Sequence, residues 1–203
     1  MFVAVDGPNG VGKTSTIAAV VRRLEGRGTA VCSIRQPSET DLGDFIRLAE
    51  SRYDGLTFAA LVVADRIQLA DTVVRPAVAE GKLVITDRHI ASTLALQQVD
   101  GVDMELLWEL NAGVLKPDLS VFLNAPPEVL ETRLNDRGRT SRFEHTAGIS
   151  ASECQYFAQA AQLMSREGLR VMQLSTVDLD VEAVAAQIDA AIEATAVRVR
   201  LAD

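Results

Sequence analysis

Several residue types are scarce in this chain of 203 residues, and each scarcity excludes a class of protein. The two cysteines, Cys32 and Cys154, are too few for a disulfide scaffold and do not have the spacing of a metal site. The two histidines, His89 and His145, have no partner constellation that would form a metal centre or a catalytic triad. We therefore expect reduced core or half-buried thiols and histidines that are ordinary loop residues.

Positive charge and long apolar runs are also scarce. Twenty Lys and Arg against 28 Asp and Glu give a net charge of −8, which argues against a general nucleic-acid or anionic-membrane surface. No apolar run reaches the roughly 20 residues of a membrane span, and strand-like residues begin at Phe2 without a secretory signal. We expect a cytoplasmic protein that binds neither nucleic acid nor a membrane.

Hydrophobic residues make up 48% of the chain, enough to form a full core in one domain over 1–203. Short apolar runs alternate with segments of helical periodicity, which predicts a parallel sheet covered by helices on both faces. The five expected strands are 2–6, 29–34, 82–86, 118–123 and 169–174. The expected helices lie near 13–26, 40–53, 56–80, 91–99, 103–114, 127–137, 150–167 and 180–200.

Residues 7–14 are the most informative segment, because they read GPNGVGKT and fit the phosphate-binding pattern G-x-x-x-x-G-K-[ST]. The three glycines permit backbone angles that turn amide groups toward phosphate oxygens. The helix that follows points the positive end of its dipole at the same anion. Lys13 adds a full charge, and the hydroxyl of Thr14 is a hard oxygen ligand suited to Mg²⁺. The segment also lies between an expected strand and an expected helix, as a phosphate loop requires.

Ligands of open parallel sheets bind beyond the carboxyl ends of the strands, and polar residues gather at three of these ends. Arg35 follows the second expected strand, and Asp87 and Arg88 follow the third. The arginine-rich run 133–144 follows the fourth strand and its helix. These residues would surround an anionic ligand.

Several blocks resemble the thymidylate kinase family of P-loop nucleoside monophosphate kinases. That family's D-R-[YH]-x-x-S-x-x-A-Y-Q block is similar to DRHIASTLALQ at 87–97, and its R-G-x-x-x-R-x-E lid is similar to RGRTSRFE at 137–144. Its P-D-L-T segment resembles PDLS at 117–120, and the A-x-R of its substrate-facing helix matches ADR at 64–66. The resemblance covers most of 1–165. It implies an α/β, P-loop NTPase-type three-layer sandwich, with a lid near 135–150.

The resemblance also implies transfer of a phosphoryl group from ATP, with Mg²⁺, to a nucleoside 5′-monophosphate, a pyrimidine being favoured. The implied catalytic residues are Lys13, Asp87, Arg88 and Arg142. The implied ATP contacts are Gly7, Asn9, Gly10, Val11, Gly12, Lys13, Thr14, Ser15, Arg137 and Arg139, the lid arginines and Arg142 closing over the donor phosphates. The implied acceptor contacts are Asn9, Arg35, Val62, Arg66, Arg88, Ser92 and Leu96. The implied metal contacts are Thr14 and, through water, Asp87.

Four departures from the family pattern fall mainly on the acceptor side. Asn9 stands where the family usually has Asp or Glu, and Val62 stands where a phenylalanine stacks on thymine. Leu96 replaces the tyrosine that flanks the sugar, and an arginine and a tyrosine of the helix after the lid are replaced around Gln159 and Leu163. These departures predict an acceptor other than plain thymidine monophosphate, or poor use of it.

Several of these assignments have a purely structural alternative. Arg66 could face solvent, and Arg139 could belong to a solvated cluster of charges. Val62 and Leu96 could be ordinary core residues if the alignment shifts by one helical turn. Phe143 is expected to be a packing anchor.

Other functions also stay open at this stage. A loop of this kind could serve a kinase for a modified nucleotide, a nucleoside or another small alcohol of specialised metabolism, although Arg35 and Arg88 favour an anionic acceptor. A non-catalytic nucleotide-binding or switch protein is the alternative of another class, but the chain has no N-K-x-D base-reading motif. The resemblance further implies a homodimer that packs through helices, with the alanine-rich region of the substrate-facing helix as the candidate surface.

Overall fold

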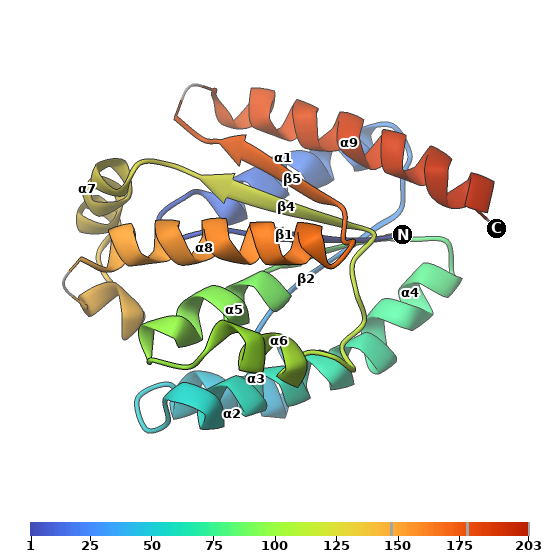
Figure 1. The fold of residues 1–203 in the computed structure, drawn as a ribbon. Helices are drawn as coiled ribbons and strands as arrows, with labels where there is room; N and C mark the ends of the chain where they lie inside the picture. Colours follow the sequence, from blue (N-terminus) through green and yellow to red (C-terminus); the bar gives the residue numbers. More distant parts are fainter. Residues whose placement is uncertain (147, 178, 203) are drawn as a thin grey trace.

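The computed structural model describes residues 1–146, 148–177 and 179–202, and its centre is a parallel sheet. The five strands follow the order β2-β3-β1-β4-β5, and all paired neighbours are parallel (Figure 1). The strands are β1 Phe2–Asp6, β2 Val31–Arg35, β3 Leu83–Asp87, β4 Leu119–Asn124 and β5 Val171–Ser175. All five expected strands are confirmed, with ends shifted by no more than two residues.

Helices connect successive strands, as the alternating pattern predicts. They are α1 Lys13–Gly26, α2 Asp41–Ala49, α3 Gly55–Leu69, α4 Arg75–Ala79, α5 Ile90–Val99, α6 Met104–Leu110, α7 Pro127–Arg137, α8 Ile149–Arg166 and α9 Val181–Ala202. A π-helical turn, η1 Ala70–Val74, joins α3 to α4, and a short 3-10 turn, η2 Phe143–His145, precedes α8. In the part of the chain that the structure describes, no helix has the length and apolar character needed to cross a membrane.

Three expected helices differ from the structure. The helix expected at 56–80 is divided by η1, because Pro76 has no N–H for a bond to the carbonyl four residues earlier and its ring needs the wider turn. The helix expected at 103–114 ends at Leu110, where the backbone N–H of Asn111 closes the last turn. The helix expected at 40–53 ends at Ala49, before a turn at residues 50–52.

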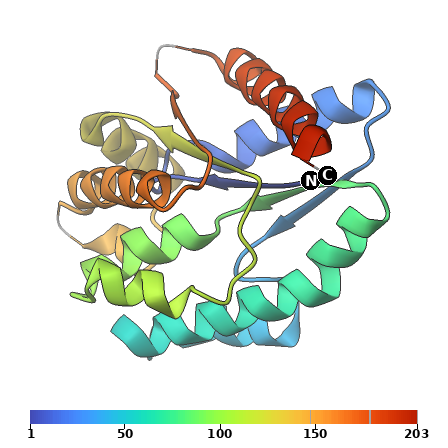
Figure 2. The same ribbon diagram turned by 45° about the vertical axis from the view of Figure 1, so that its right-hand side comes forward.

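Helices cover both faces of the sheet, which confirms the three-layer arrangement (Figures 1 and 2). On one face α1 packs against α9, and on the other α5 packs against α8, with α3 and α6 beyond them. Because side chains of a strand alternate between faces, Val3 and Val5 join the core under α1 and α9. Phe122 of β4 joins the second core, under α5 and α8. With both faces buried, the central strands are largely apolar, with Thr86 and Ser120 as buried polar residues inside them.

The parallel arrangement brings the carboxyl ends of all the strands to one edge, on the left in Figure 1. The loop after β1, the Asp87–Arg88 segment after β3 and α7 after β4 all begin there. Residues far apart in the sequence therefore meet at this edge, which is the place predicted for a ligand.

The packing of α9 on α1 predicts a stability difference between two positions of the same helix. Ile188 is fully buried, whereas Val197 is 58% exposed. We expect Ile188→Ala to lower the free energy of unfolding by about 2–5 kcal/mol, because it leaves a cavity in the core. Val197→Ala, the matched control, should change it by no more than about 0.5 kcal/mol. Urea unfolding measures both, and equal losses would contradict the assigned packing.

Candidate active site

The loop between β1 and α1 has the conformation that its glycines predict. Gly7, Gly10 and Gly12 have φ angles of 151°, 79° and 95°, all in the region that side chains disfavour. A Cβ atom on Gly7 would lie 2.4 Å from the carbonyl oxygen of Leu123 in β4, so only glycine fits there. Helix α1 begins directly after Gly12. The loop and the helix N-terminus together form an anion-binding cradle.

Lys13 lies inside this cradle. It is 7% exposed, and its Nζ donates to the carbonyl oxygens of Gly7, at 2.8 Å, and Pro8, at 2.9 Å. Burial, followed by the nearby positive charge of Arg88, lowers the pKa of Lys13 to about 7. A phosphate placed in the cradle would raise this pKa again, because a neighbouring negative charge favours the ammonium form.

Oxygen atoms suited to a magnesium ion lie beside the loop. The Oγ1 of Thr14 donates to Oδ2 of Asp87 at 3.0 Å. The other oxygen of Asp87 and Oδ2 of Asp6 are buried and have no hydrogen-bond partner among the described residues. Mg²⁺ takes such hard oxygens from one or two carboxylates and completes its shell with substrate phosphates and water. This donor set fits the ion, although the described residues contain no cluster of three or more His, Cys, Asp or Glu that would hold a metal alone.

Arg88 has a strained backbone and a fixed side chain. Its φ of 72° is the one positive value on a residue other than glycine in 1–146, 148–177 and 179–202. Its Nη2 donates to Oδ1 of Asn9 at 2.6 Å, and its Nη1 donates to Oγ of Ser92 at 3.1 Å. Strain of this kind persists where the surroundings fix it and is concentrated at functional sites.

Most of the predicted phosphate contacts surround one cavity of about 620 Å³, called here the phosphate cavity. The predicted residues in its lining are Asn9, Gly10, Gly12, Lys13, Thr14, Ser15, Arg35, Asp87, Arg88 and Arg137. The other lining residues are Arg47, Arg133, Thr140, Ser141 and Glu144. Five arginines and one lysine thus face two carboxylates, a balance that suits a polyphosphate.

Two predicted loop contacts lie outside this lining. The carbonyl oxygen of Gly7 instead accepts the hydrogen bond from Lys13, and the side chain of Val11 packs in the core under α1. Arg35 does line the phosphate cavity, at the end of β2 and beside Asp87 in the sheet register. Its side chain is 60% exposed and forms an ion pair with Glu39 at 3.2 Å.

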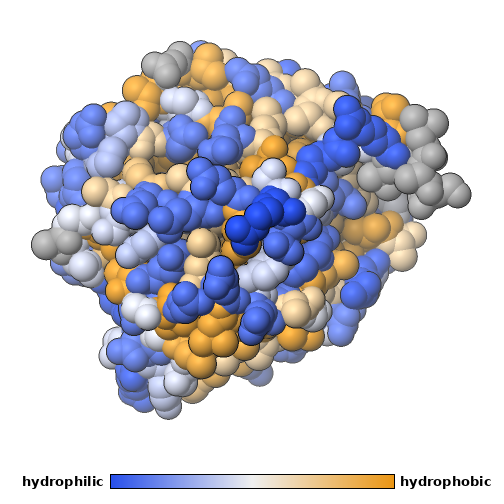
Figure 3. All heavy atoms as spheres, in the orientation of Figure 1, coloured by the Kyte–Doolittle hydropathy of each residue, from blue (hydrophilic) through white to orange (hydrophobic). Residues whose placement is uncertain are grey.

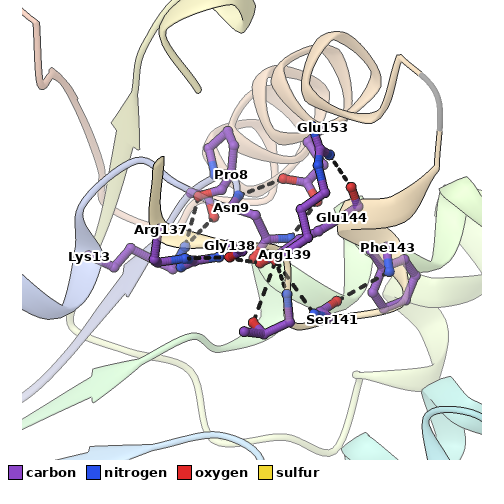
Figure 4. A network of polar contacts seen from close by, with 12 residues as sticks. Pro8, Asn9, Lys13, Arg137, Gly138, Arg139, Ser141, Phe143, Glu144 and Glu153 are labelled. Carbon is purple, nitrogen blue, oxygen red and sulfur yellow. Dashed lines mark hydrogen bonds and ion pairs between the residues drawn. The ribbon is translucent and has the colours of Figure 1, made fainter. Parts of the chain in front are cut away.

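The lid arginines are arranged differently from the expectation. Arg137 lines the phosphate cavity and pairs with Glu144 at 2.7 Å (Figure 4). Arg139 instead bonds to Glu131 and to the backbone carbonyl of Glu144, outside the cavity lining. Arg142 also lies outside it, because both of its Nη atoms are bonded to the carboxylate of Asp100, at 2.8 and 2.6 Å. In this structure only the first of the three lid arginines faces the phosphate cavity.

The lid fold itself is organised by Glu144. Its side chain is 3% exposed and accepts hydrogen bonds from the backbone N–H groups of Thr140, at 2.7 Å, and Ser141, at 3.5 Å. Burial raises the pKa of Glu144, but these N–H groups and Arg137 outweigh it and hold the pKa below its ordinary value. Residue 147, within the expected lid, lies outside the described residues.

A second cavity, of about 150 Å³, adjoins the first and is called here the apolar cavity. Its lining residues are Asn9, Gln36, Pro37, Ile46, Arg47, Glu50, Phe58, Val62, Arg66, Arg88, Ser92, Thr93, Leu96, Gln97, Ser141 and Phe143. Every predicted acceptor contact except Arg35 is among them. The two cavities share Asn9, Arg47, Arg88 and Ser141. A ligand in one cavity can therefore meet a ligand in the other at Arg88.

Arg66 does not face solvent, which excludes the structural alternative for this residue. It is 1% exposed, and its guanidinium group donates to Gln36, Asn111, Thr93 and the carbonyl oxygen of His89, at 2.6–3.1 Å. These bonds use four of its five N–H groups. Arg66 thus ties α3 to α5 and α6 and forms a polar end of the apolar cavity.

Two aromatic residues of the apolar cavity were not among the predicted ligand contacts. Phe58 lies one helical turn before Val62 and lines the same cavity, so an aromatic wall is present four residues from the predicted position. Phe143 of η2 also lines it, which makes this expected packing anchor a candidate ligand contact. The guanidinium group of Arg142 lies 4.0 Å from the Phe143 ring and 5.5 Å from the Phe58 ring. The i, i+4 spacing of Phe58 and Val62 was the available signal.

Arg47 and Glu153 were also missed. Arg47 of α2 lines both cavities, and its Nη1 donates to the carbonyl oxygens of Pro37, at 2.9 Å, and Ser38, at 2.7 Å. Glu153 of α8 is 1% exposed and accepts two hydrogen bonds from Asn9. No motif marks either residue in the sequence.

Comparisons with known proteins agree with this geometry. A family model described as thymidylate kinase matches residues 5–188. A probable thymidylate kinase of Caldivirga maquilingensis is 36% identical over 166 residues, which cover 80% of this chain and 81% of the relative. One from Thermococcus kodakarensis is 30% identical over 204 residues, covering 95% and 97%. A thymidylate kinase of Synechococcus sp. (strain JA-2-3B'a(2-13)) is 38% identical over 146 residues, covering 68% and 71%.

The low pKa of Lys13 predicts proton uptake when a polyphosphate binds. At pH 8 the free lysine is mostly neutral, and a bound anion restores its proton, so tripolyphosphate with Mg²⁺ should take up close to one proton per site. At pH 6 the lysine is already charged and the uptake should largely disappear. Calorimetric titration in buffers of different ionisation enthalpy measures this. Uptake that is the same in Lys13→Met as in the unmodified protein would contradict the assignment to Lys13.

The ion pair between Arg142 and Asp100 predicts that Asp100 helps to hold the lid in place. Asp100→Asn removes the charge and one of the two acceptor oxygens, so hydrogen exchange in peptides covering 138–146 should be about tenfold faster. Asp71→Asn, which breaks an exposed ion pair with Arg75, is the matched control and should leave these peptides unchanged. Equal exchange in both variants would show that Asp100 does not hold the lid.

Proposed function

Because the chain belongs to the thymidylate kinase family, we propose that it uses ATP and Mg²⁺ to phosphorylate a pyrimidine nucleoside 5′-monophosphate to the diphosphate. Membership makes it a nucleoside monophosphate kinase, which transfers a phosphoryl group to a nucleoside monophosphate. One observation carries the finer proposal: a cationic phosphate cavity and a small apolar cavity meet at Arg88.

On the donor side, the phosphates of ATP would lie over the glycine loop, with the ammonium group of Lys13 beside them. A third cavity, of about 260 Å³ between the loop, Arg133 and Thr176, has room for the rest of the donor nucleotide. Mg²⁺, held by Thr14 with Asp87 nearby, would supply positive charge to the phosphate oxygens. Phosphoryl transfer needs little more than such charge neutralisation and alignment, and these side chains are placed to provide both.

On the acceptor side, the monophosphate would lie where the two cavities meet. Arg88 lines both, so its guanidinium group can contact the acceptor phosphate and the transferred group without moving between them. Arg47 lines both as well, and Arg35 lies at the rim of the phosphate cavity. These positive charges offset the repulsion between two anionic substrates.

The apolar cavity suits a single-ring base. Its volume of about 150 Å³ is small, and the rings of Phe58 and Phe143 offer surfaces for stacking. Arg66 and Gln97 supply polar groups for the edge of the base. Leu96 lines the cavity where the resemblance leads us to expect a tyrosine, so redirected or relaxed specificity stays part of the proposal.

The homodimer implied by the resemblance stays a prediction, and one surface is a candidate for it. Large apolar side chains are exposed on three helices that contact one another in series, α2, α3 and α6. These side chains are Phe45, Leu48, Leu56, Ile67 and Leu106. Figure 3 shows hydrophobic residues gathered over α3 and α6, and exposed patches of this kind often mark interfaces.

A panel of acceptors tests the function. ADP production from MgATP is measured with the monophosphates of thymidine, deoxyuridine, uridine, cytidine, deoxycytidine, adenosine and guanosine, and with the free nucleosides. We expect turnover with pyrimidine monophosphates and none with free nucleosides, which cannot occupy the phosphate contact at Arg88. Lys13→Met is the control and should abolish turnover, because it removes the charge beside the donor phosphates. Preference for a purine monophosphate or a free nucleoside would contradict the proposed acceptor.

A further inference from the structure

We infer that Glu153 is a positioning residue for Arg88, which it orients by fixing the amide group of Asn9 between the two side chains. The inference rests on the proposed function, in which Arg88 contacts the acceptor phosphate and the transferred group. Glu153 lies on α8, 144 residues from Asn9 in the sequence, and lines neither cavity itself.

Both oxygens of the Glu153 carboxylate are bonded to one residue of the phosphate loop. The backbone N–H of Asn9 donates to Oε2 and the side-chain Nδ2 of Asn9 donates to Oε1, each at 2.6 Å (Figure 4). Glu153 is 1% exposed, so these bonds form away from bulk water, where charge-assisted hydrogen bonds are strong. The Glu153 carboxylate therefore fixes both the backbone and the side chain of Asn9, the third residue of the loop.

The two neighbours of the Asn9 amide leave it one orientation. An ionised carboxylate only accepts hydrogen bonds and a guanidinium group only donates them, whereas an amide has one accepting and one donating end. With Nδ2 bonded to Glu153, Oδ1 faces Arg88 and accepts from its Nη2 at 2.6 Å. A rotated amide would place oxygen against carboxylate and N–H against guanidinium. Glu153 thereby decides which atom Arg88 meets.

Arg88 depends on this contact because it has few others. Its side chain lines both cavities, and the described hydrogen bonds of its guanidinium group go to Asn9 and Ser92 alone. Without a fixed acceptor at Asn9, the guanidinium group would be held at Nη1 only and could turn away from the acceptor phosphate. Such a movement of the guanidinium group would slow the reaction, because phosphoryl transfer relies on the alignment of the two substrates.

The Glu153 carboxylate has no cationic side chain bonded to it directly among the described residues. No ion pair among the described residues includes it, although Lys13 is close enough to interact with it electrostatically. A buried carboxylate is costly unless hydrogen bonds satisfy it, and here the donors come from the loop residue that faces Arg88. The hydrogen bonds from Asn9 to Glu153 and from Arg88 to Asn9 thus fix Arg88 without a direct ion pair to Glu153, and Arg88 still lines both cavities.

A double-mutant cycle tests whether Glu153 acts through Arg88. Glu153→Gln leaves one acceptor oxygen and no charge, and we expect kcat to fall about ten- to a hundredfold, with a smaller change in the KM for ATP. In an Arg88→Met background the same substitution should have little further effect, because the residue through which it acts is gone. Glu167→Gln, the same change just beyond the end of α8, is the control and should leave kcat within about twofold.

A charge exchange tests the orientation of the amide. Asn9→Asp alone would set two carboxylates against each other and should lower kcat at least as much as Glu153→Gln. In the combined Asn9→Asp and Glu153→Gln variant, the new amide can donate to the new carboxylate, which can then accept from Arg88. We expect kcat to recover to within about tenfold of the unmodified protein. Thermal unfolding of each variant identifies any that fail to fold.

The outcomes separate this inference from the function on which it rests. No turnover by the unmodified protein on any acceptor would overturn both. Turnover that Glu153→Gln leaves unchanged, or lowers by the same factor with and without Arg88→Met, would overturn the positioning role alone. A combined variant that folds but is no more active than Asn9→Asp would overturn the assigned amide orientation.

Discussion

The buried carboxylate of Asp6, at the carboxyl end of the central strand, organises the segment on which the site depends. Its Oδ1 accepts hydrogen bonds from the backbone N–H groups of His89, at 3.0 Å, and Ser92, at 3.1 Å, and from the Ser92 hydroxyl at 2.7 Å. These bonds satisfy N–H groups at the start of α5, as an N-terminal cap does. They also fix the turn in which Arg88 adopts its positive φ, while Asn9 and Ser92 hold the guanidinium group at the end of that side chain.

The sheet and the phosphate loop could be predicted from the sequence because their determinants are local. Short apolar runs and their alternation with helices specify a parallel sheet, and the spacing of the glycines, Lys13 and Thr14 specifies a loop whose atoms come from neighbouring residues. The division of the long helix at η1 shows the limit of periodicity. The pattern of apolar residues continues through Pro76, but Pro76 has no N–H to continue the α-helical hydrogen bonds. The wider π turn before it accommodates the proline ring.

The partners of the arginines could not be predicted in the same way. A guanidinium group pairs with whichever carboxylate the fold brings near it, and Arg142 meets Asp100 because η2 lies against the end of α5. The role of Glu153 could not be predicted from the sequence either, because its partner, Asn9, lies 144 residues away in the chain. Phe58 lies one helical turn before Val62, the residue that the family pattern indicates. Residues four apart lie on the same face of a helix, so the pattern predicts the face of α3 that lines the cavity but not the exact residue.

The concentration of positive charge in the site costs stability, although the protein as a whole is acidic. Burial makes the charged form of Lys13 unfavourable in the empty cradle, while five arginines line the same cavity within a chain of net charge −8. Glu39 and Glu144 offset part of this repulsion through direct ion pairs with Arg35 and Arg137, and Asp6 and Glu153 add negative charge near Lys13. In the proposed function, a bound polyphosphate would supply the negative charge that the empty cavity lacks and would so stabilise the fold.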